Sequence, residues 1–173
     1  MDKIELSSLP KKTLIDIIQT YSQNTLTIDG LWFIGMEERY GIEKAIETDI
    51  SVWRRYGIIE ARRIKRILNI TDDGVSALAK ALNLQIWVQS KGMQYDIVRS
   101  AGNKVVFNVT DCSVQRARMR DNRPLFECKR VGVALFEEFA KEINPKFKMK
   151  CLVCPPDDHP DDLWCSWEFE LQE

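Results

Sequence analysis

The sequence predicts an α+β domain, in which N-terminal helices pack with an antiparallel sheet and one later helix. Over most of the first 83 residues, apolar side chains recur every three or four positions, as on the buried face of a helix. After Asn83 they alternate with polar residues in short runs that turn signals separate, as in strands. Helices first, then antiparallel strands around one helix, is an α+β order.

The first predicted helix follows Pro10, which suits a first helical turn, and carries apolar residues over 14–21. Asn24 and Thr25 interrupt that pattern. Asp29 is a plausible N-cap for a second helix that ends near Gly41. The sequence therefore predicts two short helices before residue 42.

The longest periodic stretch, 42–68, predicts a long amphipathic helix. A bend near Gly57 is expected because glycine weakens a helix. Thr71 is expected to cap a short helix that ends at about Leu82.

In the second half, the alternating runs predict antiparallel strands. A turn at 101–103 predicts a hairpin, and residues 131–143 predict a helix that Asn144 and Pro145 stop. The basic stretch at 112–130 is assigned no regular structure. The predicted strands are 86–88, 95–98, 104–109, 147–153 and 163–171.

The bulk properties indicate a single domain over 1–173, with a helical part at about 1–83 and an α+β part at about 84–173. The 25 basic residues nearly balance the 26 acidic ones, which argues against nucleic acid as a partner. There is no run of about 18 apolar residues and no signal-like start, so we expect no membrane partner and a cytoplasmic location. A homodimer is compatible with these properties.

The cysteines are the most informative residues for function. All five lie in the last 62 positions, and one short block holds two of them in a Cys-x-x-Cys pair, the single His159 and then a further cysteine. This spacing is typical of zinc ligands, and an odd number of thiols in a reducing compartment argues against a disulfide framework. The candidate metal ligands are Cys112, Cys128, Cys151, Cys154 and Cys165, with His159 as an alternative fourth ligand. Two other interpretations stay open: buried free cysteines, and a reactive thiol with His159 as its base.

A second candidate site follows the strand that ends near Cys112. Gln115, Arg116 and Arg118 lie where pocket-lining residues often sit, and guanidinium groups bind carboxylate or phosphate. We expect them to meet a small ligand that could be anionic. The alternative is a solvated basic loop. Asp49 and Glu60 fall near the apolar stripe of the long helix, where we expect each to pair with an arginine. The alternative is a polar pocket floor or a carboxylate metal ligand.

Several blocks of the sequence resemble an uncharacterised family labelled only "cytosolic protein". They are Asp29-Gly-Leu-Trp-Phe, Glu38-Arg-Tyr-Gly-Ile-Glu-Lys-Ala, Val52-Trp53, Thr110-Asp-Cys-Ser-Val-Gln-Arg-Ala-Arg118 and the cysteine block from Cys151 to Phe169. More distantly, the order of elements is similar to that of the L-2-amino-thiazoline-4-carboxylic acid hydrolase-like family and the vinyl-four-reductase small-molecule-binding domain. Both resemblances imply an α+β domain with a pocket between helices and sheet.

The sequence thus favours a cytoplasmic small-molecule-binding domain, sensor- or carrier-like, with a cysteine-rich site that could hold zinc. The alternative is a hydrolase of a small cyclic C–N or C–S substrate. Its nucleophile would be the thiol of Cys112 or Cys165, or a metal-bound water. The sequence assigns no further catalytic residue.

Overall fold

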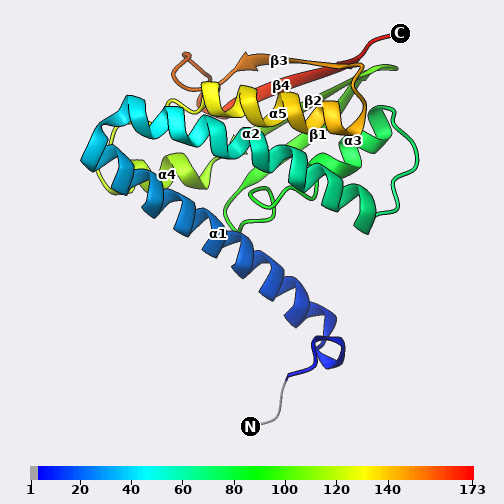
Figure 1. The fold of residues 1–173 in the computed structure, drawn as a ribbon, viewed down its shortest axis with the longest axis horizontal. Coiled ribbons are helices and arrows are strands. Elements are labelled where there is room, and N and C mark those ends of the chain that lie inside the picture. Colours follow the sequence, from blue (N-terminus) through cyan, green and yellow to red (C-terminus); the bar gives the residue numbers. More distant parts are fainter. Residues whose placement is uncertain (1–3) are drawn as a thin grey trace.

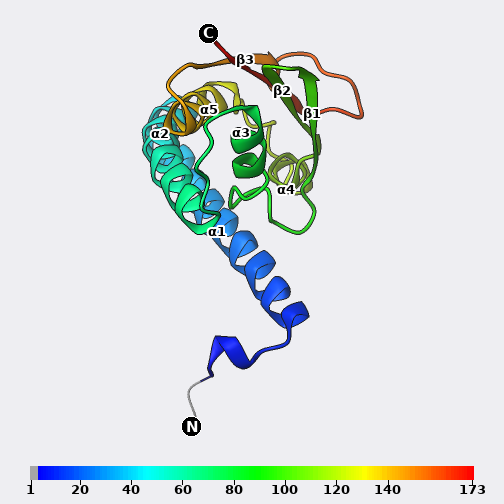
Figure 2. The same cartoon turned by 90° about the vertical axis from the view of Figure 1, so that its right-hand side faces the viewer.

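A computed structural model of the protein describes residues 4–173 and confirms the α+β fold class (Figure 1). A short 3₁₀ turn, η1 (Leu6–Ser8), precedes the helices. Helices gather on one face of a four-stranded antiparallel sheet, and the N-terminal part of the first helix projects from this body (Figures 1 and 2).

The first helix, α1 (Lys11–Tyr40), is continuous, so the predicted break at Asn24 and Thr25 and the predicted N-cap at Asp29 are wrong. Thr25 does not interrupt the helix because its hydroxyl group bonds within it. The Thr25 hydroxyl donates to the carbonyl oxygen of Tyr21 at 2.9 Å, which satisfies the side chain without an N-cap.

The second helix, α2 (Ile42–Ile67), follows a turn at Gly41, whose φ of 83° favours glycine. It runs unbroken through Gly57, where a bend was expected. Gly57 instead permits close packing: a Cβ atom there would lie 2.8 Å from the carbonyl oxygen of Leu135 on a later helix.

The third helix, α3 (Val75–Leu82), has Gly74 as its N-cap, so the predicted cap at Thr71 is wrong. Residues 86–88 form turns and no strand, which corrects a second prediction. The tertiary structure explains the difference. The Ile86 amide donates to the carboxylate of Glu60 on α2 at 2.6 Å, so this amide is not available to pair with a neighbouring strand.

The sheet has the strand order β1-β2-β4-β3, with every neighbouring pair antiparallel. Alternate residues of β2 are buried against the helices, as period-2 patterning requires. The opposite face is polar: Lys104 on β2 pairs with Glu168 on β4 at 3.3 Å. The strands are β1 (Gln94–Ala101), β2 (Lys104–Asp111), β3 (Phe147–Val153) and β4 (Cys165–Leu171).

Two helices lie between β2 and β3. The basic stretch contains α4 (Ser113–Arg120), which the sequence did not predict because the side chains it buries, Gln115 and Arg118, are polar. The second, α5 (Lys129–Ile143), was predicted to within two residues at its start. Cys112 precedes α4 and Cys128 precedes α5, so both cysteines sit at helix N-termini.

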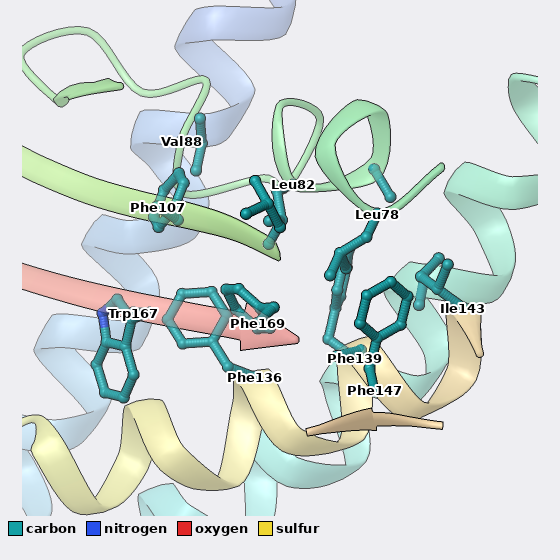
Figure 3. Close-up of a cluster of buried hydrophobic side chains, with 14 of the residues drawn as sticks. Leu78, Leu82, Val88, Phe107, Phe136, Phe139, Ile143, Phe147, Trp167 and Phe169 are labelled. Carbon is teal, nitrogen blue, oxygen red and sulfur yellow. The ribbon is translucent and has the colours of Figure 1, made fainter. Parts of the chain in front are cut away.

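One core joins the helical part to the sheet (Figure 3). Phe136 and Phe139 of α5 face Phe107 and Phe169 of the sheet, and Leu82 of α3 packs into the same cluster. The phenyl rings of Phe136 and Phe169 lie 5.7 Å apart in an edge-to-face arrangement. Among residues 4–173, no helix combines the length and the apolar character needed to span a membrane.

Candidate functional site

A cleft with a cavity volume of about 140 Å³ lies where α1, α2, α5 and the sheet meet. An apolar cavity of about 150 Å³ can hold one benzene molecule, so the cleft matches a ligand of about one ring. Its walls are mostly aromatic and aliphatic. They include Leu26, Trp53, Trp87, Met93, Val109, Val114, Phe126, Val131, Leu135, Phe136 and Trp167.

Two carboxylates interrupt this apolar lining. Asp29 of α1 and Asp49 of α2 both line the cleft, and Asp49 is only 8% exposed. Burial raises the pKa of Asp29 to about 6, against an opposing hydrogen bond with Trp53. Burial, and then the charge of Asp29, raises the pKa of Asp49 to about 7. Within residues 4–173, no lysine or arginine makes an ion pair with either carboxylate.

Two indole N–H groups in the cleft wall also lack hydrogen-bond partners. In the described part of the chain, the Nε1 atoms of Trp87 and Trp167 are buried and bond to no acceptor. Trp167 is 1% exposed, so water does not satisfy its donor from the bulk. A buried donor without an acceptor costs about 1–3 kcal/mol. A ligand with an acceptor atom would recover this cost.

The thiols gather at another wall of the cleft, which Cys112, Cys128, Cys154 and Cys165 help to line. The sulfur atoms of Cys128 and Cys154 lie 3.5 Å apart. The thiols of Cys151 and Cys165 are also close enough to Cys154 to raise its pKa. We call Cys128, Cys151, Cys154 and Cys165 the thiol cluster. Four of the five predicted metal ligands therefore meet around one sulfur.

The backbone explains how Cys151 and Cys154 come together although strand periodicity would place them on opposite faces. The pairing of β3 with β4 is irregular between Cys151 and Val153, and the strand ends at Val153. The Cys154 amide then donates to the Asp157 carboxylate at 3.3 Å in the following turn. This irregularity and turn release Cys154 from the strand pattern.

The surroundings of the thiol cluster favour negative charge on some of its sulfurs. The interaction with Cys154 lowers the pKa of Cys128 and also that of Cys151, and the Lys129 ammonium group lowers the pKa of Cys151 further. The same interactions, first that with Cys128, raise the pKa of Cys154. A proton shared with Cys154 therefore favours thiolate character at Cys128 or Cys151.

Cys112 and His159 differ from the cluster. Burial raises the pKa of Cys112 to about 12, so this thiol stays protonated at neutral pH. The His159 ring packs against Trp164 with centroids 4.9 Å apart, and its Nδ1 lies 3.0 Å from the carbonyl oxygen of Pro160. Across residues 4–173, no three His, Cys, Asp or Glu side chains already surround a point as metal ligands do.

The residues predicted to meet an anionic ligand are largely engaged with the protein. Gln115 lines the cleft, but its amide both donates to and accepts from the Phe126 backbone, at 2.8 and 2.9 Å. Arg118 is buried and makes a bidentate pair with Glu37, with both N–O distances 3.0 Å. Arg116 pairs with Asp111. An anion-binding role for these residues stays a prediction.

The carboxylate pair was not predicted from the sequence. Asp49 and Glu60 were expected to pair with arginines, but Asp49 faces the cleft and Glu60 accepts from Ile86 N and from the Tyr56 hydroxyl group, the latter at 3.1 Å. A signal was present: Asp29 follows Leu26 by three residues and precedes Phe33 by four, so it shares their helix face. Because Asp29 was predicted to be an N-cap, its place on this helix face was overlooked.

Comparison with known proteins identifies a family whose description names no activity. A family model described as "Family of unknown function (DUF6125)" matches residues 7–171, which is nearly the whole chain. A search of the curated proteins finds no match. Function must therefore be inferred from the cleft and the thiol cluster.

Proposed function

The chain belongs to this family of unknown function, and we propose that it is a small-molecule-binding domain whose ligand is about one ring in size and carries a protonated amine. The observation that carries this proposal is the carboxylate pair. Asp29 and Asp49 lie in an apolar cleft, and the described residues supply no counter-ion. An ammonium group between them would neutralise one of the two negative charges and reduce the repulsion between the carboxylates.

The apolar walls support the same ligand class. A compact aromatic or aliphatic body would fill the 140 Å³ cavity, and an acceptor atom on it would satisfy Trp87 or Trp167. The distant resemblance to the vinyl-four-reductase small-molecule-binding domain is consistent with binding. The cysteines are free thiols, which is consistent with the cytoplasmic location that we propose.

The test compares three one-ring probes of different charge at pH 7.5: benzylamine, toluene and benzoate. At ten times its dissociation constant a ligand stabilises a protein by about 1.4 kcal/mol, which for a chain of this size raises the melting temperature by about 3–6 °C. We expect benzylamine to give the largest rise and benzoate none, as measured by scanning calorimetry.

Variants of the carboxylate pair decide whether the amine binds where we propose. Asp49→Asn should abolish the advantage of benzylamine over toluene, whereas Asp121→Asn, on an exposed ion pair, should keep it. A larger rise with benzoate than with benzylamine would refute the proposal. So would an unchanged benzylamine response in the Asp49→Asn protein.

We propose in addition that the thiol cluster binds zinc. Zn–S bonds of about 2.3 Å in a tetrahedron require sulfur–sulfur distances of about 3.8 Å, and the Cys128–Cys154 distance of 3.5 Å is close to that. Gln115 Nε2, 3.6 Å from the Cys128 sulfur, and Lys129 would support bound thiolates. The other two cysteine side chains would have to rotate to complete the site, because no three ligand side chains in residues 4–173 already surround a point.

Elemental analysis of purified protein tests the zinc proposal. We expect about one zinc per chain, which Cys151→Ser and Cys154→Ser should each lose. Cys112→Ser is the matched control because the raised pKa of Cys112 disfavours the thiolate that a zinc ligand requires, and this variant should keep the metal. Metal-free wild-type protein, or equal loss in the Cys112→Ser variant, would refute a site built from these four thiols.

A hydrolase of a small cyclic C–N or C–S substrate is the second candidate function. One observation favours it: carboxyl groups with pKa values of about 6 and 7 can accept a proton from water at neutral pH. The raised pKa of Cys112 disfavours that thiol as the nucleophile. Turnover of a cyclic substrate that Asp49→Asn abolishes without loss of binding would establish this alternative.

A further inference from the structure

One face of α1 carries an apolar stripe that the body of the protein leaves uncovered. Its residues alternate at spacings of four and three, which is the heptad pattern of a helix that pairs with another helix. Five such spacings, or two full heptads and a further half, fit within α1, a helix of 30 residues. The stripe consists of Leu14, Ile18, Tyr21, Thr25, Ile28 and Trp32.

Four large residues of the stripe are mostly exposed. Ile18 and Tyr21 are 55% and 65% exposed, and Ile28 and Trp32 are 70% and 68% exposed. Ser22 lies on another face of α1, where it is buried and donates to the Ile86 carbonyl oxygen. The body therefore packs against a different side of α1 and leaves the stripe accessible.

We infer that the stripe binds the same stripe of a second copy of this chain, as an antiparallel pair of α1 helices about a two-fold axis. A two-fold interface requires one surface to be complementary to itself. The stripe meets this condition when the axis passes beside Gln23, because residues whose numbers add to 46 then face each other. The resulting contacts are Leu14 with Trp32, Ile18 with Ile28, and Tyr21 with Thr25.

The size of each residue supports this register. Trp32, the largest side chain of the stripe, faces Leu14, which is smaller, and Tyr21 faces the small Thr25. Ile18 and Ile28 make the symmetric apolar contact between them. Large residues thus meet smaller ones, as knobs-into-holes packing requires. A parallel pair would instead place each tryptophan against its own copy.

The apolar area of the stripe is at the upper end of that of an ordinary surface patch and approaches that of a dimer interface. A fully exposed aromatic side chain presents 150–250 Å², so the exposed fractions of the stripe and the adjoining Leu31, itself 67% exposed, amount to on the order of 600 Å². The largest apolar patch of a typical monomer is about 300–600 Å², and a stable interface buries about 800 Å² on each partner. Flanking polar residues of α1 would supply the remainder.

Sedimentation equilibrium of the full chain is the first test. The chain mass is 20.1 kDa, and we expect a mass of twice that value at micromolar concentration. Ile18→Lys and Ile28→Glu should each return the protein to a monomer, because each places two charges in the apolar seam. Ile67→Lys, at an equally exposed position at the end of α2, is the matched control and should leave the dimer intact.

Mixing the two monomeric variants tests the register. In a mixed antiparallel pair, the lysine side chain introduced by Ile18→Lys would face the glutamate side chain introduced by Ile28→Glu in the other chain. The two remaining isoleucines would face each other, so we expect the dimer to return. Circular dichroism should show folded protein throughout, since the altered positions are exposed.

Three outcomes would contradict this interface. A monomeric wild-type protein would overturn the inference as a whole. A dimer that persists in both single variants would show that another surface holds the two chains together. A mixture of the two variants that stays monomeric would overturn the antiparallel register.

Discussion

At the scale of single residues, the surroundings of a side chain decide its charge. Asp29 and Asp157 have the same carboxyl group and opposite pKa shifts. Burial in the cleft raises the pKa of Asp29 to about 6. A hydrogen bond from Lys129 lowers the pKa of Asp157. The first carboxylate therefore destabilises the fold when ionised, whereas the second stabilises it.

The pH dependence of stability follows for Asp49. Its pKa is about 7 in the folded chain against 3.8 as a free group, so the folded state binds the proton more tightly. Stability from this group is complete below pH 4 and is lost as the pH rises to about 7. Relative to wild type, Asp49→Asn should therefore gain roughly 2 kcal/mol of unfolding free energy between pH 5 and pH 8, as measured by urea denaturation.

Glu60, whose pKa burial also raises to about 7, is present in both proteins and cancels from this difference. Asp121→Asn serves as the control because an exposed pair with Arg120 lowers the pKa of Asp121, which places its titration below this range. A flat difference between pH 5 and pH 8 would show that Asp49 is not desolvated in the folded protein.

Single residues also show the limit of sequence analysis at the site. The cysteines could be selected from their spacing, because thiols are rare and chemically distinctive. Asp49 was noticed on the apolar stripe of α2, but its partner could not be identified. Asp29 lies on a different helix, and only the packing of α1 against α2 brings the two carboxylates to one cleft.

At the scale of elements, the contact of α5 with β4 depends on one missing side chain. A Cβ atom at Gly132 would lie 2.6 Å from the indole ring of Trp167. That ring is almost fully buried between α5 and the neighbouring strands, so it has little room to move. The close approach of the helix also places Trp167 at the wall of the cleft.

Gly132→Ala should therefore destabilise the protein, although alanine is the better helix former. We expect a loss of about 1–3 kcal/mol from overpacking, measured as a lower midpoint of urea unfolding. Gly30→Ala is the matched control, because no atom would lie within 4 Å of a Cβ there. That substitution should stabilise α1 by about 0.5–1 kcal/mol. Equal effects at both positions would contradict the packing argument.

Elements with a regular apolar face were predicted well, whereas elements held in place by buried polar groups were not. α5 and β2 carry regular apolar patterns, and the sequence places them nearly correctly. α4 buries an amide and a guanidinium group, which a hydrophobic pattern does not detect. Residues 86–88 have strand-like composition, but a hydrogen bond to Glu60 holds them in a turn.

At the scale of the whole molecule, the fold class was predictable because it depends on the order of elements along the chain. The site depends on contacts between elements. The thiol cluster combines the start of α5, the end of β3, the following turn and the start of β4. Sequence spacing suggested that these thiols share a function, but only the folded chain shows that Cys128 and Cys154 pair directly while Cys112 lines the same cleft wall beside them.

The distribution of the indole side chains has a practical consequence. Trp53, Trp87 and Trp167 surround the cleft, whereas Trp32 is solvent-exposed on α1. Buried indoles emit at shorter wavelength than exposed ones, so the buried Trp167 contributes a blue component and the exposed Trp32 a red one, with the half-buried Trp53, Trp87 and Trp164 between them. Quenching of the blue component would report occupancy of the cavity, and a blue shift of the red component would report association of α1. Both events can be followed in one spectrum without attaching a dye.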